Sequence, residues 1–229
     1  MVIKAVIFDL FGTLVFDNFS SKRYPAFLSG LANLLGLKES EFIPLWQASY
    51  RGRTIGKFET LQDNFRWVGG QLGRTLNPSG VDEAALQIVQ LTRRALTPRV
   101  HAVETIGQLR QKGFKTALIS DCGPAVPLIW NETPFADLFD SAVFSCRERL
   151  KKPDPKFYQI VLDRLSLPAQ DCFYVGDGHS GEIEGAKGMG MTPVLIWSVI
   201  DTDEPERLVV KDWKGATITS LAEVLPLLS

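Results

Sequence analysis

The chain begins MVIKAVIFDLFGTLV (residues 1–15), and this stretch decides the fold class. Residues 4–8, KAVIF, form an apolar run without polar alternation, which is typical of a strand covered on both faces. The run ends at Asp9, and a turn containing Gly12 and Thr13 follows. Because open α/β sheets bind ligands beyond the carboxyl ends of their strands, Asp9 lies where a ligand site is expected.

Further apolar runs of this kind alternate with helical patterns along the chain. Helical spacing is present in residues 100–113, which end at Lys112-Gly113, and again in residues 153–166 and 180–190. Alternating strands and helices predict an α/β fold with a doubly wound parallel sheet, a Rossmann-like core. The expected strands are KTALIS (115–120), SAVFSC (141–146), CFYVG (172–176) and TPVLIW (192–197).

One region interrupts this alternation and contains only helical patterns. The sequence therefore predicts an all-helical domain at residues 16–97, inserted into a core made of residues 1–15 and 98–229. The helical patterns cover residues 24–36, 39–52, 58–74 and 82–96.

Composition excludes several function classes for this chain of 229 residues. A formal net charge of −1 gives no overall attraction to nucleic acid or to an anionic membrane. No apolar run approaches the ~18 residues of a membrane span, and no signal peptide is visible. The three cysteines lack CxxC spacing, so we expect buried thiols in a reducing compartment. These features predict a cytoplasmic protein, and they say nothing about the oligomeric state.

Four candidate functional residues are expected to meet at one edge of the sheet. Asp9, Ser120 and Asp177 each stand at the carboxyl end of an expected strand, and Lys152 lies in the loop after residues 141–146. The carboxyl ends of parallel strands share one edge, so residues far apart in the sequence can form a single site there.

These residues belong to four motifs whose order resembles that of the haloacid dehalogenase superfamily of hydrolases, with a helical cap after the first motif. The resemblance covers essentially the whole chain and implies that Asp9 is a nucleophile that forms an aspartyl intermediate. It implies that Ser120 donates a hydrogen bond to the transferring group and that Lys152 offsets its charge. Substrate contacts are expected from Gly12, Thr13 and Asp121. The motifs are Asp9-Leu10-Phe11-Gly12-Thr13, Ser120-Asp121, Lys152-Pro153-Asp154-Pro155, and Gly176-Asp177-Gly178 with Glu182.

The resemblance also implies a magnesium site. Asp177 and Glu182 complete an acidic cluster with Asp9, and three carboxylates without a cation repel one another. Mg²⁺ resolves this repulsion with oxygen ligands. In the resembled phosphatases a backbone carbonyl two residues after the nucleophile is a further ligand, and here it belongs to Phe11.

The Phe11 side chain stands where most of the resembled hydrolases have a second Asp, which protonates the leaving group and activates water. Three functions stay open: a Mg²⁺-dependent phosphohydrolase for good leaving groups, a metal-independent 2-haloacid dehalogenase, and a binding protein without catalysis. We favour the phosphohydrolase because an acidic cluster without a cation makes little sense beside a substrate carboxylate. His179 and Asp17 are weak candidates to replace the missing acid.

The expected helical insertion also contains residues that suit an anionic substrate. The stretch YRGRTIGKF (50–58) places Arg51, Arg53 and Lys57 among glycines, and arginine forks bind carboxylate or phosphate. A solvated loop between helices explains the same pattern. The nearby Trp46 and Trp67 fall on helical patterns, which indicates core packing more than substrate stacking.

Overall fold

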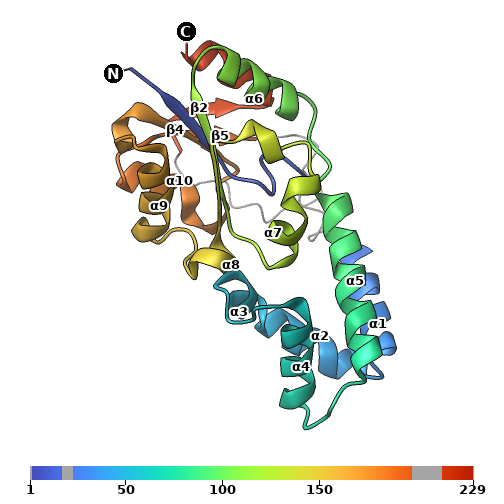
Figure 1. The fold of residues 1–229 in the computed structure, drawn as a ribbon. Coiled ribbons are helices and arrows are strands. Elements are labelled where there is room, and N and C mark those ends of the chain that lie inside the picture. The colour runs from blue at the N-terminus through green and yellow to red at the C-terminus, as the bar shows by residue number, and fades with distance from the viewer. Residues whose placement is uncertain (1, 17–22, 198–212, 229) are drawn as a thin grey trace.

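The structure of the chain is a computed structural model that describes residues 2–16, 23–197 and 213–228. Its elements form a sheet with helices on both faces and a helical segment (residues 23–95) that extends away from one end of the sheet (Figure 1). Asp17 lies outside the described residues.

In the described part of the chain the sheet has six parallel strands in the order β3-β2-β1-β4-β5-β6, which confirms the predicted α/β fold. The first strand is central: Ala5 is level with Lys115 on one side and with Cys172 on the other. Strand β6 follows no predicted pattern, because three residues are too few to show one. The strands are β1 (Ala5–Phe8), β2 (Lys115–Ser120), β3 (Ser141–Phe144), β4 (Cys172–Gly176), β5 (Thr192–Ile196) and β6 (Ala216–Ile218).

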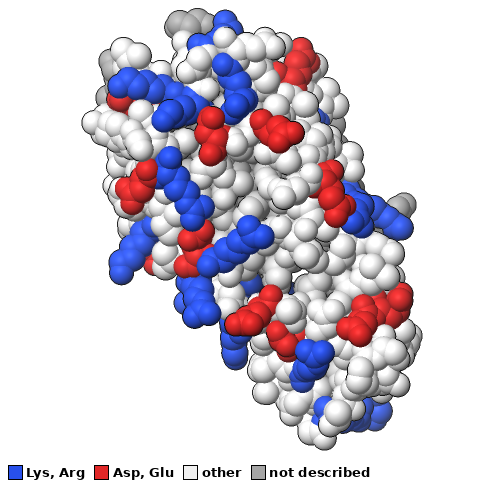
Figure 2. Space-filling model, viewed as in Figure 1, with Lys and Arg blue, Asp and Glu red and all other residues white. Residues whose placement is uncertain are grey.

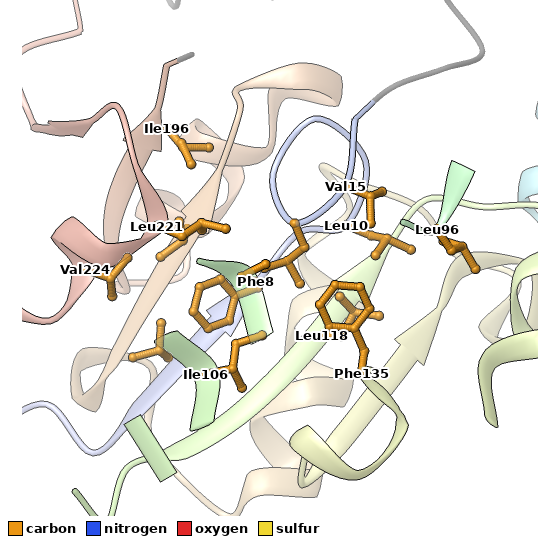
Figure 3. Packing of buried hydrophobic residues seen from close by; sticks show 14 of the residues in the cluster. Phe8, Leu10, Val15, Leu96, Ile106, Leu118, Phe135, Ile196, Leu221 and Val224 are labelled. Carbon is orange, nitrogen blue, oxygen red and sulfur yellow. The ribbon is translucent and has the colours of Figure 1, made fainter. Parts of the chain in front are cut away.

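Both faces of the central strand are buried, as its uninterrupted apolar sequence predicts. Val6 and Phe8 belong to a cluster with α6 (Ala102–Gln111), and Figure 3 shows Phe8 beside Ile106 of that helix. The alternate residues Ala5 and Ile7 pack in a second cluster with residues of α9 (Pro155–Leu165) and α10 (Glu182–Gly188). These two layers hold the carboxyl end of β1, and hence Asp9, in place.

The helices around the sheet follow the predicted patterns with two exceptions. The predicted strand at residues 141–146 ends at Phe144, because Ser145 already starts the short helix α8 and its hydroxyl accepts a hydrogen bond from the Cys122 amide. Helix α7 was not predicted, since Pro124 and Pro127 interrupt its pattern. Within the described residues, no helix is long and apolar enough to cross a bilayer. The helices not yet given are α7 (Ala125–Ile129) and α8 (Ser145–Glu148).

The helical segment packs around a hydrophobic cluster of its own, which includes Trp46 and Phe65. A single helix was predicted for residues 39–52, but it breaks at Ser49, whose hydroxyl donates to the Trp46 carbonyl. Capping fixes the other helix starts: Thr60 forms a capping box and Asn77 precedes a proline at the first helical position. The helices are α1 (Arg23–Leu34), α2 (Glu39–Ala48), α3 (Tyr50–Thr54), α4 (Leu61–Gln71) and α5 (Pro78–Ala95).

Contacts at the end of the sheet join the helical segment to the rest of the chain. Ala125 of α7 is buried in the hydrophobic cluster of the segment. Gly56 has a φ of +65°, and a Cβ there would lie 2.1 Å from the Cys146 carbonyl oxygen. The segment therefore lies against the loops that follow β2 and β3.

Candidate active site

The turn after β1 presents Asp9 at the carboxyl edge of the sheet. The Asp9 amide donates to the Val175 carbonyl at 2.9 Å, which continues the pairing of β1 with β4. The amides of Leu14 and Val15 then donate back to the Leu10 carbonyl, and Gly12 has a φ of +80°. This tight turn leaves the Asp9 side chain 7% exposed.

Lys152 lies at the centre of the site and contacts residues of the other three motifs. Its ammonium donates to the Asp9 carboxylate and, at 2.6 Å, to Glu182 Oε2. Its backbone amide donates to Asp121 Oδ1 at 3.0 Å. The side chain is 3% exposed, so both ion pairs are shielded from solvent. Although burial opposes the charged form, the carboxylates of Asp9 and Glu182 raise the pKa of Lys152 well above its ordinary value.

Glu182 is fully buried and uses both carboxylate oxygens. Oε2 accepts from Lys152 and from the Tyr174 hydroxyl at 2.7 Å, while Oε1 accepts from the Gly178 amide at 3.1 Å. A Cβ at Gly176 would lie 2.2 Å from Oε1, so the glycine of the fourth motif makes room for this carboxylate. The sequence analysis missed Tyr174, although a tyrosine in a buried strand needs a polar partner for its hydroxyl.

Asp177 follows β4 and faces the same cluster. One oxygen of its carboxylate accepts from the His179 amide at 3.0 Å, and the other lies 3.3 Å from His179 Nδ1. Positive φ angles at Gly178, Ser180 and Gly181 curl this loop before α10 begins. His179 also lines the cavity described below.

Carboxylate oxygens of Asp9, Asp177 and Glu182 lie within 4.8 Å of one another, and all three residues are buried. Burial first, and then the Glu182 charge, raise the pKa of Asp9 from 3.8 to about 7. Burial also raises the pKa of Glu182. With all three ionised, the three carboxylates face one ammonium and leave a net charge of two negative, so the donor set fits a hard divalent cation.

A cavity of about 560 Å³ opens between this cluster and the helical segment. Asp9, Lys152 and Glu182 lie on its lining together with Phe11 and Asp121. The loop after β2 and the start of α7 close one side of it. Arginine, tryptophan and tyrosine side chains of the helical segment close the other side. The lining from this segment consists of Tyr24, Trp46, Gln47, Tyr50, Arg53, Thr54, Leu61, Ile88 and Thr92.

Three expected site residues, Gly12, Thr13 and Ser120, do not line the cavity. Thr13 and Ser120 are fully buried, and neither hydroxyl has a hydrogen-bond partner among the described residues. Gly12 shapes the turn beside them. Ser120 closes the strand that adjoins β1, which places its hydroxyl at the same sheet edge as Asp9.

The structure separates the three expected cations of residues 50–58. Arg53 lines the cavity, whereas Arg51 is exposed outside it and the Lys57 ammonium lies 5.3 Å from the centroid of the Trp67 ring. Trp46 is 2% exposed and belongs to the core of the segment, yet it also borders the cavity. The helical spacing of Trp46 in the sequence favoured only the first of these roles.

Comparisons with known proteins give related descriptions. A family model described as haloacid dehalogenase-like hydrolase matches residues 3–190. Glyceraldehyde 3-phosphate phosphatase of Pyrococcus furiosus is 28% identical over 130 residues, which are 56% of this chain and 52% of that protein, so the match spans about half of its length. (S)-2-haloacid dehalogenase of Xanthobacter autotrophicus is 28% identical over 203 residues, 85% of this chain and 75% of that protein.

The fold itself also has solved counterparts. A structure of a phosphatase of this type from Thermococcus onnurineus superposes with a TM-score of 0.69 at 22% identity, and the match covers 99% of this chain and 98% of that one. At this identity the likeness shows the fold. The four motifs therefore lie on a chain whose architecture is that of a known hydrolase class.

Proposed function

The chain belongs to the haloacid dehalogenase-like hydrolases, and we propose that it is a Mg²⁺-dependent phosphohydrolase that acts through an aspartyl phosphate at Asp9. Residues 16–97 serve as its cap, and its substrate is a small anionic metabolite in the cytoplasm. The observation that carries the proposal is the cluster of three buried carboxylates around Lys152. A hydrolase that handles a substrate carboxylate without a metal has no use for that excess of negative charge.

The metal ligands are assigned to Asp9, Asp177 and the Phe11 carbonyl. Glu182 is near enough to take part, but both of its oxygens already accept hydrogen bonds from the protein. We therefore assign it the role of holding Lys152 toward Asp9. Bound Mg²⁺ supplies the positive charge that lets an anionic phosphoryl group approach the Asp9 carboxylate.

In the first chemical step, an Asp9 oxygen forms a bond to phosphorus while the bond from phosphorus to the leaving-group oxygen breaks. The leaving group departs with that electron pair. Lys152 and Ser120 stabilise the charge on the transferring phosphoryl oxygens. In the second step the oxygen of a water molecule forms a bond to phosphorus while the bond from phosphorus to the Asp9 oxygen breaks. This regenerates the Asp9 carboxylate, and the phosphate leaves with the water proton.

Phe11 limits the first step to leaving groups that depart without a proton. A positioned acid contributes roughly 10²–10⁴-fold to rate, and phenylalanine has no proton to give. Acyl phosphates and aryl phosphates carry stable leaving groups, whereas a simple sugar phosphate must expel an alkoxide. The proposal thus predicts a steep dependence of rate on the leaving group.

A 2-haloacid dehalogenase is the second candidate. Halide leaves without protonation, so the lack of an acid at Phe11 does not slow this reaction. The relative from Xanthobacter autotrophicus, matched over 85% of this chain, supports it. In that reaction Asp9 would attack carbon, and no step would need Asp177.

The two candidates are separated by one substrate panel, assayed with and without Mg²⁺. The panel contains p-nitrophenyl phosphate, acetyl phosphate, a simple sugar phosphate and 2-chloropropionate. We expect Mg²⁺-dependent turnover of the first two, its loss in Asp9→Asn, and little turnover of the sugar phosphate. Metal-independent chloride release would identify a dehalogenase instead. Equal rates on aryl and sugar phosphates would contradict the role given to Phe11.

A further inference from the structure

Arg53 is the one cavity-lining cation of the described helical segment, and it is held rigidly. Its Nη1 donates to the Trp46 carbonyl at 2.7 Å, to the Ser49 hydroxyl, and to Asn64 Oδ1 at 3.3 Å. The centre of its guanidinium lies 4.1 Å from the centroid of the Trp46 ring. These contacts fix the plane of the guanidinium before any ligand arrives.

Among the residues that the structure describes, the charge of Arg53 has no acidic partner. Across the described chain, no carboxylate lies within ion-pair distance of its guanidinium, and its acceptors are a carbonyl, a hydroxyl and an amide. Each cavity carboxylate, in contrast, has a lysine partner: Asp9 and Glu182 share the Lys152 ammonium, and Asp121 faces Lys151 at 3.7 Å. Burial lowers the pKa of Arg53 to about 10, so the guanidinium remains charged at neutral pH.

Within the described structure, Arg53 donates hydrogen bonds from Nη1 alone. The edge of the guanidinium formed by Nε and Nη2 therefore makes no hydrogen bond there. Such an edge matches the two oxygens of a carboxylate or phosphate. Lysine and arginine side chains on the surface differ from Arg53 in their neighbours. On the face seen in Figure 2, basic and acidic side chains are interspersed. A desolvated cation without a counter-ion is costly unless a ligand supplies the anion.

Resting on the proposed function, we infer that Arg53 binds a second anionic group of the substrate, at the side of the cavity opposite the phosphoryl group held at Asp9. The substrate class is then a phosphorylated compound that carries a further oxyanion, a carboxylate or a second phosphate. Its body packs against apolar side chains, because Leu61, Ile88 and Val126 also line the cavity.

The test is equilibrium binding of phosphonates, whose carbon–phosphorus bond the proposed reaction does not break. Calorimetry in the presence of Mg²⁺ measures the Kd of alkylphosphonates of two to five carbons. These values are compared with the Kd of the same chains that end in a carboxylate or in a second phosphonate. At one chain length we expect the second anion to tighten binding by roughly 10–100-fold, the range for a charge-assisted hydrogen bond. The more effective end group identifies the anion. If no length shows a gain in the wild-type protein, the inference is wrong.

Variants then assign the gain to Arg53. Arg53→Met should abolish it, and Arg53→Lys should keep a part of it, because a point charge replaces the fork. Arg66→Met is the matched control, since Arg66 belongs to the same segment and its side chain is 60% exposed. This variant should retain the full gain in affinity from the second anion. Thermal melting checks that each variant is folded, and a full gain in folded Arg53→Met overturns the inference.

This experiment separates the inference from the proposed function. Because binding is measured without turnover, a gain that depends on Arg53 stands even if acetyl phosphate is not hydrolysed. Conversely, Mg²⁺-dependent hydrolysis of acetyl phosphate without any gain from a second anion leaves the proposed function intact and removes the role of Arg53.

Discussion

Replacing Lys152 with methionine tests whether the buried ammonium holds the site together. Methionine keeps most of the side-chain volume but removes the charge. Asp9 and Glu182, whose side chains are 7% and 1% exposed, then lose their only lysine or arginine partner among the described residues. Removing one member of a buried ion pair costs about 3–5 kcal/mol, because the other charge stays desolvated.

In a domain of this size each kcal/mol lowers Tm by roughly 2–4 °C, so the melting temperature of Lys152→Met should fall by about 6–20 °C in EDTA at pH 8. Added Mg²⁺ should restore part of this loss, because it supplies positive charge to the same carboxylates. The double variant Lys152→Met with Glu182→Gln should melt above Lys152→Met alone, since it removes one of the two stranded charges.

Lys151→Met is the matched control for this measurement. Lys151 is the preceding residue, its side chain is 29% exposed, and its ammonium lies 3.7 Å from Asp121. An ion pair of this kind contributes at most about 1 kcal/mol, so the Tm should fall by a few degrees or less. If both lysine variants melt within 2 °C (roughly 1 kcal/mol) of the wild type, the reasoning about the buried pair is refuted.

Three further predictions concern catalysis, protons and the joint between the two parts of the chain. Phe11→Asp should raise the rate at which a sugar phosphate phosphorylates Asp9 by roughly 10²-fold, with little effect on phosphorylation by acetyl phosphate, because it returns a proton donor for the leaving group. Rapid-quench measurement of the phosphorylation step with both substrates tests this, and equal changes on both contradict it. Because the pKa of Asp9 is raised from 3.8 to about 7, increasing the pH through that interval should destabilise the metal-free protein. The rise in Tm caused by Mg²⁺ should therefore be larger at pH 8 than at pH 6. A rise in Tm that does not depend on pH speaks against a proton on Asp9. Gly56→Ala should weaken the contact between the helical segment and the rest of the chain, since its Cβ would lie 2.1 Å from the Cys146 carbonyl oxygen at a φ of +65°. The rate of proteolysis and the KM should both increase relative to Gly73→Ala. Gly73 is an exposed control with a similar φ of +64° and open space for a Cβ.

The sheet could be predicted because its signals are local. Strand β1 is buried on both faces, so apolar residues fill every position. Strand β4 is buried throughout as well, and β2 and β5 are buried over most of their length. Topology then brings Asp9, Lys152 and Asp177 to one edge although they are distant in the sequence. Their convergence needed only the parallel order of the strands, and the close approach of their side chains agrees with it.

Contacts between elements could not be predicted, because they depend on how the helices pack. Nothing in the sequence distinguishes Arg53 from Arg51 two residues earlier; the short helix α3 points one into the cavity and leaves the other exposed. The occupancy of both Glu182 oxygens follows from the curl of the loop after β4. Strand β6 is too short to carry a pattern and is defined by its pairing with β5.

The central claim is a phosphoryl group carried on Asp9, and trapping that intermediate tests it most directly. The protein is mixed with acetyl phosphate and Mg²⁺, quenched with borohydride, which reduces an aspartyl phosphate to homoserine, and digested for mass spectrometry. We predict homoserine at position 9, dependent on Mg²⁺ and absent without substrate. An unmodified Asp9 during confirmed turnover, or homoserine at another carboxylate such as Asp121, would contradict the account.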